Sequence, residues 1–273
     1  MSNAIQSFNL TGRTAIITGG AGLLGQEFCH TLAEAGAAVV VADLNAPSAE
    51  AVASHVTRQG HQALGIGVDI TKPDSVHQMV TTAKAAFGSI DILVNSAALD
   101  PKFDPQHQGQ HDNAFETYPL ELWNQALSVN LTGMFLCTQA VVQVMLAQDR
   151  GVIINLCSIY GLVGPDQRLY QRPKQAFQYK PVYYSVTKAG VLGMTRYLAA
   201  YYAGHNIRVN ALTPGGVYAG HDDTFVQNYS SRAILGRMAR KDEMNGALLF
   251  LASEASAYMT GANLVVDGGW TAW

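Results

Sequence analysis

A tyrosine and a lysine four positions apart have the types and spacing that acid–base chemistry requires. They are Tyr184 and Lys188 in "YYSVTK". Positions four apart lie on one face of a helix, so both side chains can reach one site, whereas Tyr183 points about 100° away. A phenol has a pKa of about 10 and is a poor base at neutral pH. Because a nearby ammonium group stabilises the phenolate, the pair predicts that Tyr184 exchanges a proton with an alcohol or a ketone.

A glycine-rich turn near the N-terminus indicates where a dinucleotide would bind. In "TAIITGGAGLLG", the residues Gly19, Gly22 and Gly25 lie between an apolar run and a helical pattern. Glycines let the backbone approach a pyrophosphate, and the free N–H groups of the following helix favour its charge. Asp43 ends the next apolar run, where a carboxylate can bond ribose hydroxyls and would repel a 2′-phosphate. The two features predict NAD rather than NADP as the cofactor.

The elements that must position these residues alternate along the chain. Several short runs are hydrophobic at almost every position, which is typical of parallel strands covered on both faces. The alternation predicts one α/β domain over 1–273, a doubly wound Rossmann fold with about seven parallel strands and helices on both faces. Strands are expected at 14–18, 38–42, 63–68, 90–95, 151–156, 208–212 and 263–266. Helices are expected at 22–35, 46–59, 73–87, 119–148, 182–204 and 240–252.

Two long segments, 100–118 and 161–181, interrupt this alternation. Each follows an expected strand, at the edge where open α/β sheets bind ligands, so both are expected to cover a substrate. The second segment carries Arg168 and Arg172 among aromatic residues. Arginines bind carboxylates or phosphates with paired hydrogen bonds, which favours a polar, anionic carbohydrate. A solvated basic loop is the alternative for this segment.

The composition argues against several classes of function. A formal net charge of −3, with acids and bases scattered, disfavours a nucleic-acid partner bound through a basic face. Neither a secretory signal nor an uninterrupted apolar run of about 18 residues is recognisable, so no membrane span is expected. The three separated cysteines are expected to be buried free thiols of a cytoplasmic protein. His107 and His111 are four positions apart but have no third fixed ligand, so no metal site is expected.

In their order along 10–269, these motifs resemble the short-chain dehydrogenase/reductase family, in its single-domain NAD-dependent branch. The matching stretches are "TGGAGLLG", "VDI", "NSAA", "SVNLTG", "INLCSIYG", "YSVTK", "RVNALTPGG" and "MTGANLVVDGG". The resemblance implies a catalytic tetrad of Asn130, Ser158, Tyr184 and Lys188. It implies cofactor contacts from Gly19, Gly22, Leu23, Leu24, Gly25, Asp43, Asp69, Ile70, Asn95, Ala97, Tyr184, Lys188, Pro214, Gly215 and Val217.

The resemblance also implies a role for each member of the tetrad. Tyr184 would be the acid–base residue, and Ser158 would orient the substrate oxygen. Lys188 would also bond the nicotinamide ribose, and Asn130 would hold a water molecule that links Lys188 to solvent. The nicotinamide would carry the hydride. Members of this branch commonly form tetramers, so a homotetramer is expected.

The chain departs from the family pattern at several positions. Leu23 stands where the single-domain branch usually has its middle glycine, and the resulting TGxxGxxG spacing resembles that of the sugar-nucleotide-modifying branch. "NSAA" replaces the usual "NNAG", and Ala219 replaces a hydroxyl residue that often contacts the diphosphate. Ser158 and Tyr184 are further apart than usual, and the excess is the segment 161–181.

The substrate is expected to be a sugar, a sugar acid or a sugar derivative. "SIYGLVGPDQRLYQ" and "PGGVYAG" are similar to family members that act on sugars or in surface-polysaccharide pathways. Tyr160, Arg168 and Arg172 are the expected substrate contacts. The same tetrad could serve a 3-oxoacyl thioester reductase, which Asp43 disfavours because that reduction usually uses NADPH. An NAD-binding sensor or scaffold without turnover is the alternative of another class.

Overall fold

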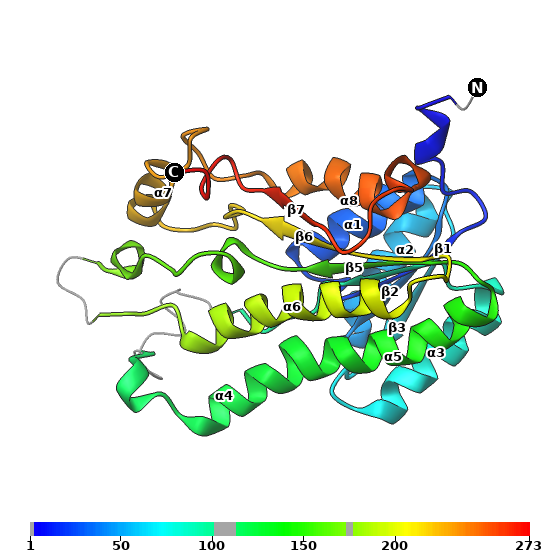
Figure 1. The fold of residues 1–273 in the computed structure, drawn as a ribbon, viewed down its shortest axis with the longest axis horizontal. Helices are drawn as coiled ribbons and strands as arrows, with labels where there is room; N and C mark the ends of the chain where they lie inside the picture. Colours follow the sequence, from blue (N-terminus) through cyan, green and yellow to red (C-terminus); the bar gives the residue numbers. More distant parts are fainter. Residues whose placement is uncertain (1–2, 101–112, 173–176) are drawn as a thin grey trace.

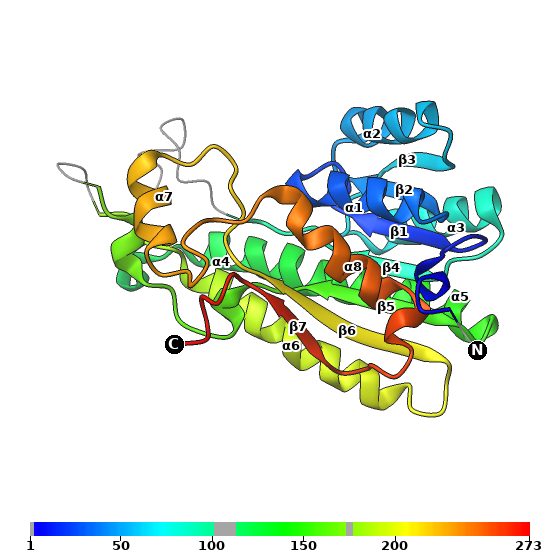
Figure 2. The same cartoon turned by 90° about the horizontal axis from the view of Figure 1, so that it is seen from above.

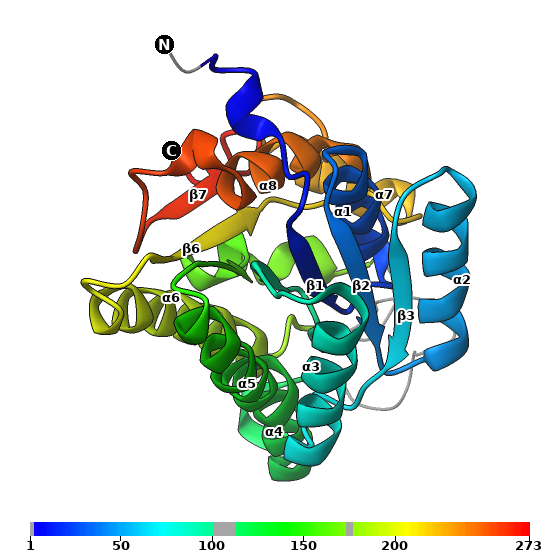
Figure 3. The same ribbon diagram turned by 90° about the vertical axis from the view of Figure 1, so that its right-hand side faces the viewer.

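A parallel sheet of seven strands lies at the centre of the protein, and helices cover both of its faces (Figures 1 and 3). The computed structural model describes residues 3–100, 113–172 and 177–273. The strand order is β3-β2-β1-β4-β5-β6-β7, so the predicted doubly wound Rossmann fold is confirmed. The strands are β1 (Thr14–Thr18), β2 (Ala38–Asp43), β3 (Ala63–Gly67), β4 (Ile92–Asn95), β5 (Gly151–Leu156), β6 (Ile207–Pro214) and β7 (Asn263–Val266).

Alternating side chains of each central strand build the two halves of the core. On β1, Ile17 packs into the cluster beneath one layer of helices, and Ile16 packs into the cluster beneath the other. Every residue of β1 is buried, which explains why its sequence is apolar without alternation. One layer consists of α1 (Leu23–Glu34), α2 (Ala46–Arg58) and α8 (Asn245–Ala252). The opposite layer consists of α3 (Pro73–Phe87), α5 (Met134–Ala147) and α6 (Val182–Tyr201).

The helix expected over 119–148 is not uniform. α4 (Leu120–Leu127) and α5 are joined by η4 (Ser128–Gly133), a turn of π-helix that contains Asn130. Turns of π-helix are rare in proteins, and those that occur are often found at functional sites. By length and apolar composition, the run Leu120–Ala147 is also the one helix among the described residues that could cross a membrane. Half of its most apolar window is buried inside the protein, as in the core helix of a globular protein.

The described part of the segment 161–181 is a packed structure rather than a solvated loop. Tyr160 and Tyr170 share a buried cluster with Phe225 of α7 (Asp223–Ser230). α7 lies beside this segment, beyond the carboxyl ends of the strands (Figures 1 and 2). The remaining short helices are η1 (Gln6–Phe8), η3 (Phe115–Thr117), η5 (Ile159–Gly161), η6 (Gln167–Tyr170), η7 (Lys241–Met244) and η8 (Glu254–Ser256).

Candidate active site

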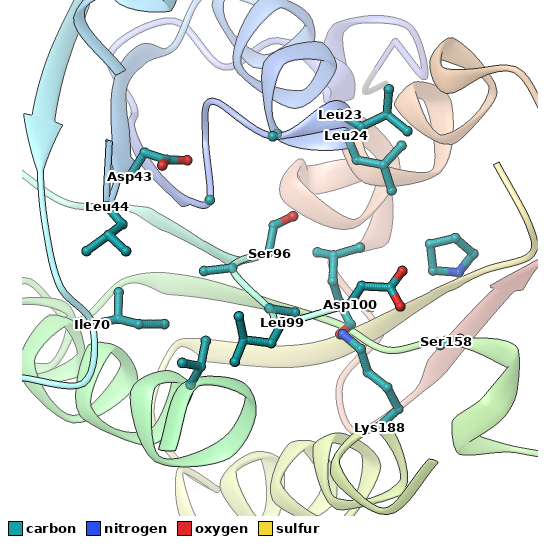
Figure 4. A pocket seen from close by; sticks show the side chains of 18 of the residues that line it. Leu23, Leu24, Asp43, Leu44, Ile70, Ser96, Leu99, Asp100, Ser158 and Lys188 are labelled. Atoms are coloured by element: carbon teal, nitrogen blue, oxygen red, sulfur yellow. The ribbon is translucent and has the colours of Figure 1, made fainter. Parts of the chain in front are cut away.

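A cavity of about 540 Å³ lies at the carboxyl edge of the sheet (Figure 4). Asp43 and Ile70 lie at one end of it, and Asp100, Ser158 and Lys188 lie at the other. All but one of the expected cofactor contacts line it, namely Gly19, Gly22, Leu23, Leu24, Gly25, Asp43, Asp69, Ile70, Ala97, Tyr184, Lys188, Pro214, Gly215 and Val217. The topology therefore brings segments that are far apart in the sequence to one site.

The glycine turn after β1 has no room for side chains. Gly19 has a φ of 66°, and a Cβ there would lie 2.8 Å from the Cα of Ala97. A Cβ on Gly25 would lie 2.1 Å from the carbonyl oxygen of Gly19. Gly22 precedes α1, which begins at Leu23, so the first N–H groups of this helix follow the turn directly. This cradle of backbone beside a helix N-terminus fits a dinucleotide pyrophosphate.

Asp43 is held rigidly at the end of β2. Its Oδ2 accepts a hydrogen bond from the N–H of Ala21 at 3.1 Å, and its Oδ1 accepts one from the N–H of Asn45 at 3.0 Å. The carboxylate is thereby fixed beside the glycine turn, in the wall of the cavity. An adenosine ribose bound there would meet an acceptor with a fixed orientation.

Asn95 is the one expected cofactor contact that does not line the cavity. Its side chain is buried behind the cavity wall and does not line the cavity. Its Nδ2 donates to Thr138 Oγ1 at 3.0 Å and to Asn155 Oδ1 at 2.9 Å. Asn95 therefore ties β4 to β5 and to α5, and the following residues from Ser96 onward form the wall instead. Successive residues at a strand end point in opposite directions, which explains why Asn95 does not line the cavity while Ser96 and Ala97 do. The contact of Asn95 with the cofactor stays a prediction.

Tyr184, Ser158 and Lys188 converge at the other end of the cavity. Ser158 and Tyr184 both line the cavity at this end, and the Ser158 Oγ accepts a hydrogen bond from the N–H of Tyr160 at 3.2 Å. Lys188 Nζ lies 5.8 Å from the centre of the Tyr184 ring and donates to the carbonyl oxygen of Leu156 at 2.9 Å. The structure thus brings together the three residues that the resemblance places around the reacting oxygen.

Tyr183, the neighbour of Tyr184, takes no part in this arrangement. It is buried, and its ring lies 6.1 Å from the ring of Tyr118, centre to centre. The rotation of about 100° per helical residue separates the two tyrosines. The predicted register, with Tyr184 and not Tyr183 facing Lys188, is the one that α6 adopts.

Burial dominates the electrostatics of the acid–base pair. Desolvation raises the pKa of Tyr184 well above its usual value, and the charge of Asp100 raises it further, while the hydrogen bond from Ser158 opposes both. Desolvation also lowers the pKa of Lys188. Cationic groups near the ring oppose this rise of the Tyr184 pKa, because a nearby positive charge stabilises the phenolate.

Asn130 lies behind the cavity rather than in its wall. Its Oδ1 accepts from the N–H of Leu99 at 2.7 Å, and its Nδ2 donates to the Leu99 carbonyl oxygen at 3.1 Å. The same Nδ2 lies 3.2 Å from Thr187 Oγ1, one residue before Lys188. Asn130 therefore fixes the segment after β4 against α6, from its place in the π-helical turn.

None of the expected substrate contacts lines the cavity. Tyr160 bonds the hydroxyl of Tyr170 at 3.0 Å, and its ring meets the Tyr184 ring edge-on with centres 6.5 Å apart. It supports the site without facing the open cavity. The reason is the packing of the segment 161–181 on α7, which turns this tyrosine into a core residue.

The two arginines of that segment are engaged within the protein. Arg168 pairs with Asp166 at 2.8 Å and its side chain is 75% exposed, away from the cavity. Arg172 pairs with Asp222 at 2.6 Å, and its guanidinium lies 5.8 Å from the centre of the Phe225 ring. Carboxylates of this chain pair with both arginines, so their contact with an anionic substrate stays a prediction that the structure does not support.

Sequence reasoning missed three polar residues at the end of the cavity that contains Ser158, Tyr184 and Lys188, which we call the reacting end. Asp100 and His221 line the cavity, and Lys180 lies over the Tyr184 ring with its ammonium 4.0 Å from the ring centre. Only the position of Asp100 after a strand could have indicated it in advance. His107 and His111 lie outside the described residues, and the described part of the chain contains no cluster of three metal-binding side chains.

Comparisons with known proteins agree with this geometry. A family model described as enoyl-(acyl carrier protein) reductase matches residues 20–271. The chain is 37% identical over 264 residues to a cis-4-hydroxycyclohexanecarboxylate dehydrogenase of Sinomonas cyclohexanicum, covering 95% of this chain and 97% of that protein. It is 35% identical over 269 residues to a D-threitol dehydrogenase of Mycolicibacterium smegmatis, covering 97% of this chain and 95% of that protein.

A solved structure extends the similarity to the fold. The crystal structure of a gluconate 5-dehydrogenase from Burkholderia cenocepacia, in complex with NADP and tartrate, superimposes with a TM-score of 0.85. The two chains are 32% identical, and the match covers 99% of this chain and 100% of that one. The glycine cradle, the tyrosine–lysine pair and these matches lead to one conclusion. This chain belongs to the short-chain dehydrogenase/reductase family, whose members act on CH–OH groups with a nicotinamide cofactor.

Proposed function

We propose that this protein is an NAD-dependent oxidoreductase that interconverts a secondary alcohol and a ketone on a sugar, a sugar acid or a sugar derivative. One observation carries the proposal. Ser158, Tyr184 and Lys188 lie at one end of a cavity whose other end holds the glycine turn and Asp43. Hydride transfer requires the nicotinamide to lie against the carbinol carbon. A cavity that binds the dinucleotide at one end and exchanges a proton with the substrate at the other meets this requirement.

The proposed mechanism assigns each step to a group of this chain. Ser158 orients the carbinol oxygen and stabilises the negative charge that develops on it. Tyr184 takes the hydroxyl proton during oxidation and returns it during reduction. Lys188 stabilises the phenolate and bonds the nicotinamide ribose, while Asn130, next to Thr187, holds the water that connects Lys188 to solvent. The nicotinamide, when bound, accepts or supplies the hydride.

Asp43 supports NAD as the preferred cofactor. Its carboxylate is fixed at the end of β2 by the N–H groups of Ala21 and Asn45. A 2′-phosphate on the adenosine ribose would meet this charge at close range, and like charges in a partly buried site repel strongly. The solved gluconate dehydrogenase contains NADP, so the cofactor choice of this chain depends on its own Asp43.

Two similar proteins support a polyhydroxylated substrate. They are a D-threitol dehydrogenase and a gluconate 5-dehydrogenase, which act on polyhydroxylated chains. A second candidate is a 3-oxoacyl thioester reductase, favoured by the acyl carrier protein in the description of the matching family model. Asp43 disfavours this candidate, because such reductions usually use NADPH.

A screen of NAD⁺ reduction over polyols, sugars, sugar acids and 3-hydroxyacyl thioesters tests the proposal. We expect NADH formation with a polyhydroxylated substrate. Tyr184→Phe should lower kcat by about a hundredfold to ten-thousandfold while NADH still binds, since only proton transfer is lost. Tyr183→Phe is the matched control and should retain turnover. Activity confined to thioesters with NADP⁺ would favour the second candidate, and full activity in Tyr184→Phe would contradict the assigned tetrad.

We also propose a cytoplasmic homotetramer. All three cysteines are buried free thiols, which suits a reducing compartment. Exposed apolar side chains gather on the helices of one layer, with Phe135 on α5 and the stacked pair Tyr197 and Tyr201 on α6. Exposed large apolar and aromatic residues on one layer of helices favour association through that layer.

A further inference from the structure

An ion pair outside the tetrad lies at the reacting end of the cavity. Asp100, in the segment after β4, lines the cavity with Ser158 and Tyr184, and its carboxylate bonds the ammonium group of Lys180. The Asp100 side chain is 56% exposed, whereas the Lys180 side chain is 8% exposed. A substrate in the cavity would therefore meet the carboxylate, with the cation buried behind it.

Lys180 is held in place from two sides. Its ammonium lies 4.0 Å from the centre of the Tyr184 ring, within range of a cation–π interaction. Its backbone N–H donates to Gln167 Oε1 at 2.8 Å, and its carbonyl oxygen accepts from Gln167 Nε2 at 3.2 Å. The segment 161–181 thus delivers a buried lysine to the acid–base residue, and the same ammonium contacts both Tyr184 and Asp100.

These contacts separate Asp100 from Tyr184 by a single ammonium group. When Tyr184 and Ser158 hold the oxygen of the reacting carbinol, the substituents on its neighbouring carbons lie close to Asp100. An ionised carboxylate only accepts hydrogen bonds, so it favours a neighbouring hydroxyl that donates one. A carboxylate or phosphate at the same place would be repelled.

His221 offers a complementary donor in the same cavity. Its Nδ1 accepts a hydrogen bond from the N–H of Ala219 at 3.3 Å, which leaves the proton of the neutral ring on Nε2. Burial lowers the pKa of His221, so the ring is neutral at pH 7. Asp100 accepts and His221 donates, and successive hydroxyl groups of a polyol need both functions.

We propose that Asp100 binds a hydroxyl group adjacent to the reacting carbinol and that Lys180 acts as its positioning residue. The enzyme then selects vicinal diols and polyols over simple alcohols and over substrates with a neighbouring anionic group. This inference rests on the proposed alcohol oxidation and narrows its substrate class. It also gives the segment 161–181 a role in substrate binding, through Lys180.

The test compares cyclohexanol with the vicinal cyclohexanediol, which share a ring and differ by one hydroxyl. We expect the wild type to oxidise the diol with the higher kcat/KM. Asp100→Asn keeps the shape but removes the charge, and should lower this preference about 10- to 100-fold, as expected for a hydrogen bond to a charged group. Asp74→Asn, on the exposed surface of α3, is the matched control and should keep the wild-type preference.

Variants of Lys180 separate positioning from general support of the fold. The Lys180→Met variant should lose the preference for the diol, whereas the Lys180→Arg variant, which keeps the positive charge, should retain most of it. Equal losses on both substrates, without rescue by arginine, would indicate a structural role only and contradict the inference. A wild type without diol preference, or an unchanged preference in Asp100→Asn, would overturn it while leaving the proposed alcohol oxidation intact. Failure to oxidise any alcohol would overturn the proposed function and this inference with it.

Discussion

The proposed role of Tyr184 as a base and the burial of its side chain have opposite requirements for the pKa of its phenol. Its phenol is the proposed base for oxidation, yet burial raises its pKa well above the usual value. Two ammonium groups, of Lys188 and Lys180, lie 5.8 Å and 4.0 Å from the centre of its ring. Since each cation favours the phenolate, the chemistry of this residue depends on both lysines.

Alcohol oxidation should therefore accelerate as the pH rises. The phenolate of Tyr184 is the reactive form, and its raised pKa leaves the phenol protonated over most of the neutral range. Ketone reduction uses the protonated phenol and should slow over the same range. The measurement is kcat/KM in both directions between about pH 6 and about pH 10. An oxidation rate that falls throughout this range would show that another group acts as the base.

Asp43 should decide between NAD and NADP. Asp43→Arg replaces a repelling charge with an attracting one, so the ratio of kcat/KM for NAD⁺ to that for NADP⁺ should fall about 10- to 100-fold. Glu50→Gln is a suitable control, because it removes an exposed charge from the neighbouring α2 outside the cavity. A wild type that already prefers NADP⁺ would contradict the proposed role of the carboxylate.

At the scale of elements, the turn between β1 and α1 has the least tolerance for an added side chain. Gly19→Ala combines a φ of 66° with a Cβ only 2.8 Å from the Cα of Ala97. We expect a loss of about 1–3 kcal/mol in the free energy of unfolding and weaker NADH binding, because the strained turn must shift away from β4. Thermal unfolding and calorimetric titration with NADH measure the two effects.

Gly60→Ala is the control that separates the effect of backbone strain from the effect of the steric clash between a Cβ on Gly19 and Ala97. Gly60 also has a positive φ, of 92°, but nothing lies within 4 Å of a Cβ built there. This variant should lose some stability and bind NADH normally. Normal NADH binding in Gly19→Ala as well would show that the turn does not approach the cofactor.

At the scale of the whole molecule, the layer formed by α3, α5 and α6 presents the proposed assembly surface. Phe135 is 47% exposed, and Tyr197 is 64% exposed. Phe135→Glu combined with Tyr197→Glu should yield smaller species, because buried charges at an interface lack partners. Light scattering after size-exclusion chromatography gives the mass. Ile5→Glu, on the exposed N-terminal turn, is the control, and an unchanged mass in the double variant would move the interface elsewhere.

Much of the fold could be predicted from local pattern, and the exceptions have local causes. The β1 strand and the α3 helix have the predicted bounds, because apolar runs and a proline-started amphipathic helix are decided by near neighbours. The π-helical turn at Asn130 interrupts an otherwise continuous helical pattern that periodicity alone reads as one helix. The sequence also did not show that the Asn95 side chain lies outside the cavity wall, because a strand-end motif does not tell which face its side chain takes.

Local patterns in the sequence were enough to predict the parallel sheet, the glycine turn, the acid at the end of the second strand and the register of Tyr184 with Lys188. Each of these follows from hydrophobic period, backbone freedom or helical geometry over a few residues. The packing of distant segments was needed to show that Arg168 and Arg172 pair with Asp166 and Asp222, and that Lys180 pairs with Asp100. Charge pairing across a fold depends on which segments pack together, and no local pattern contains that information.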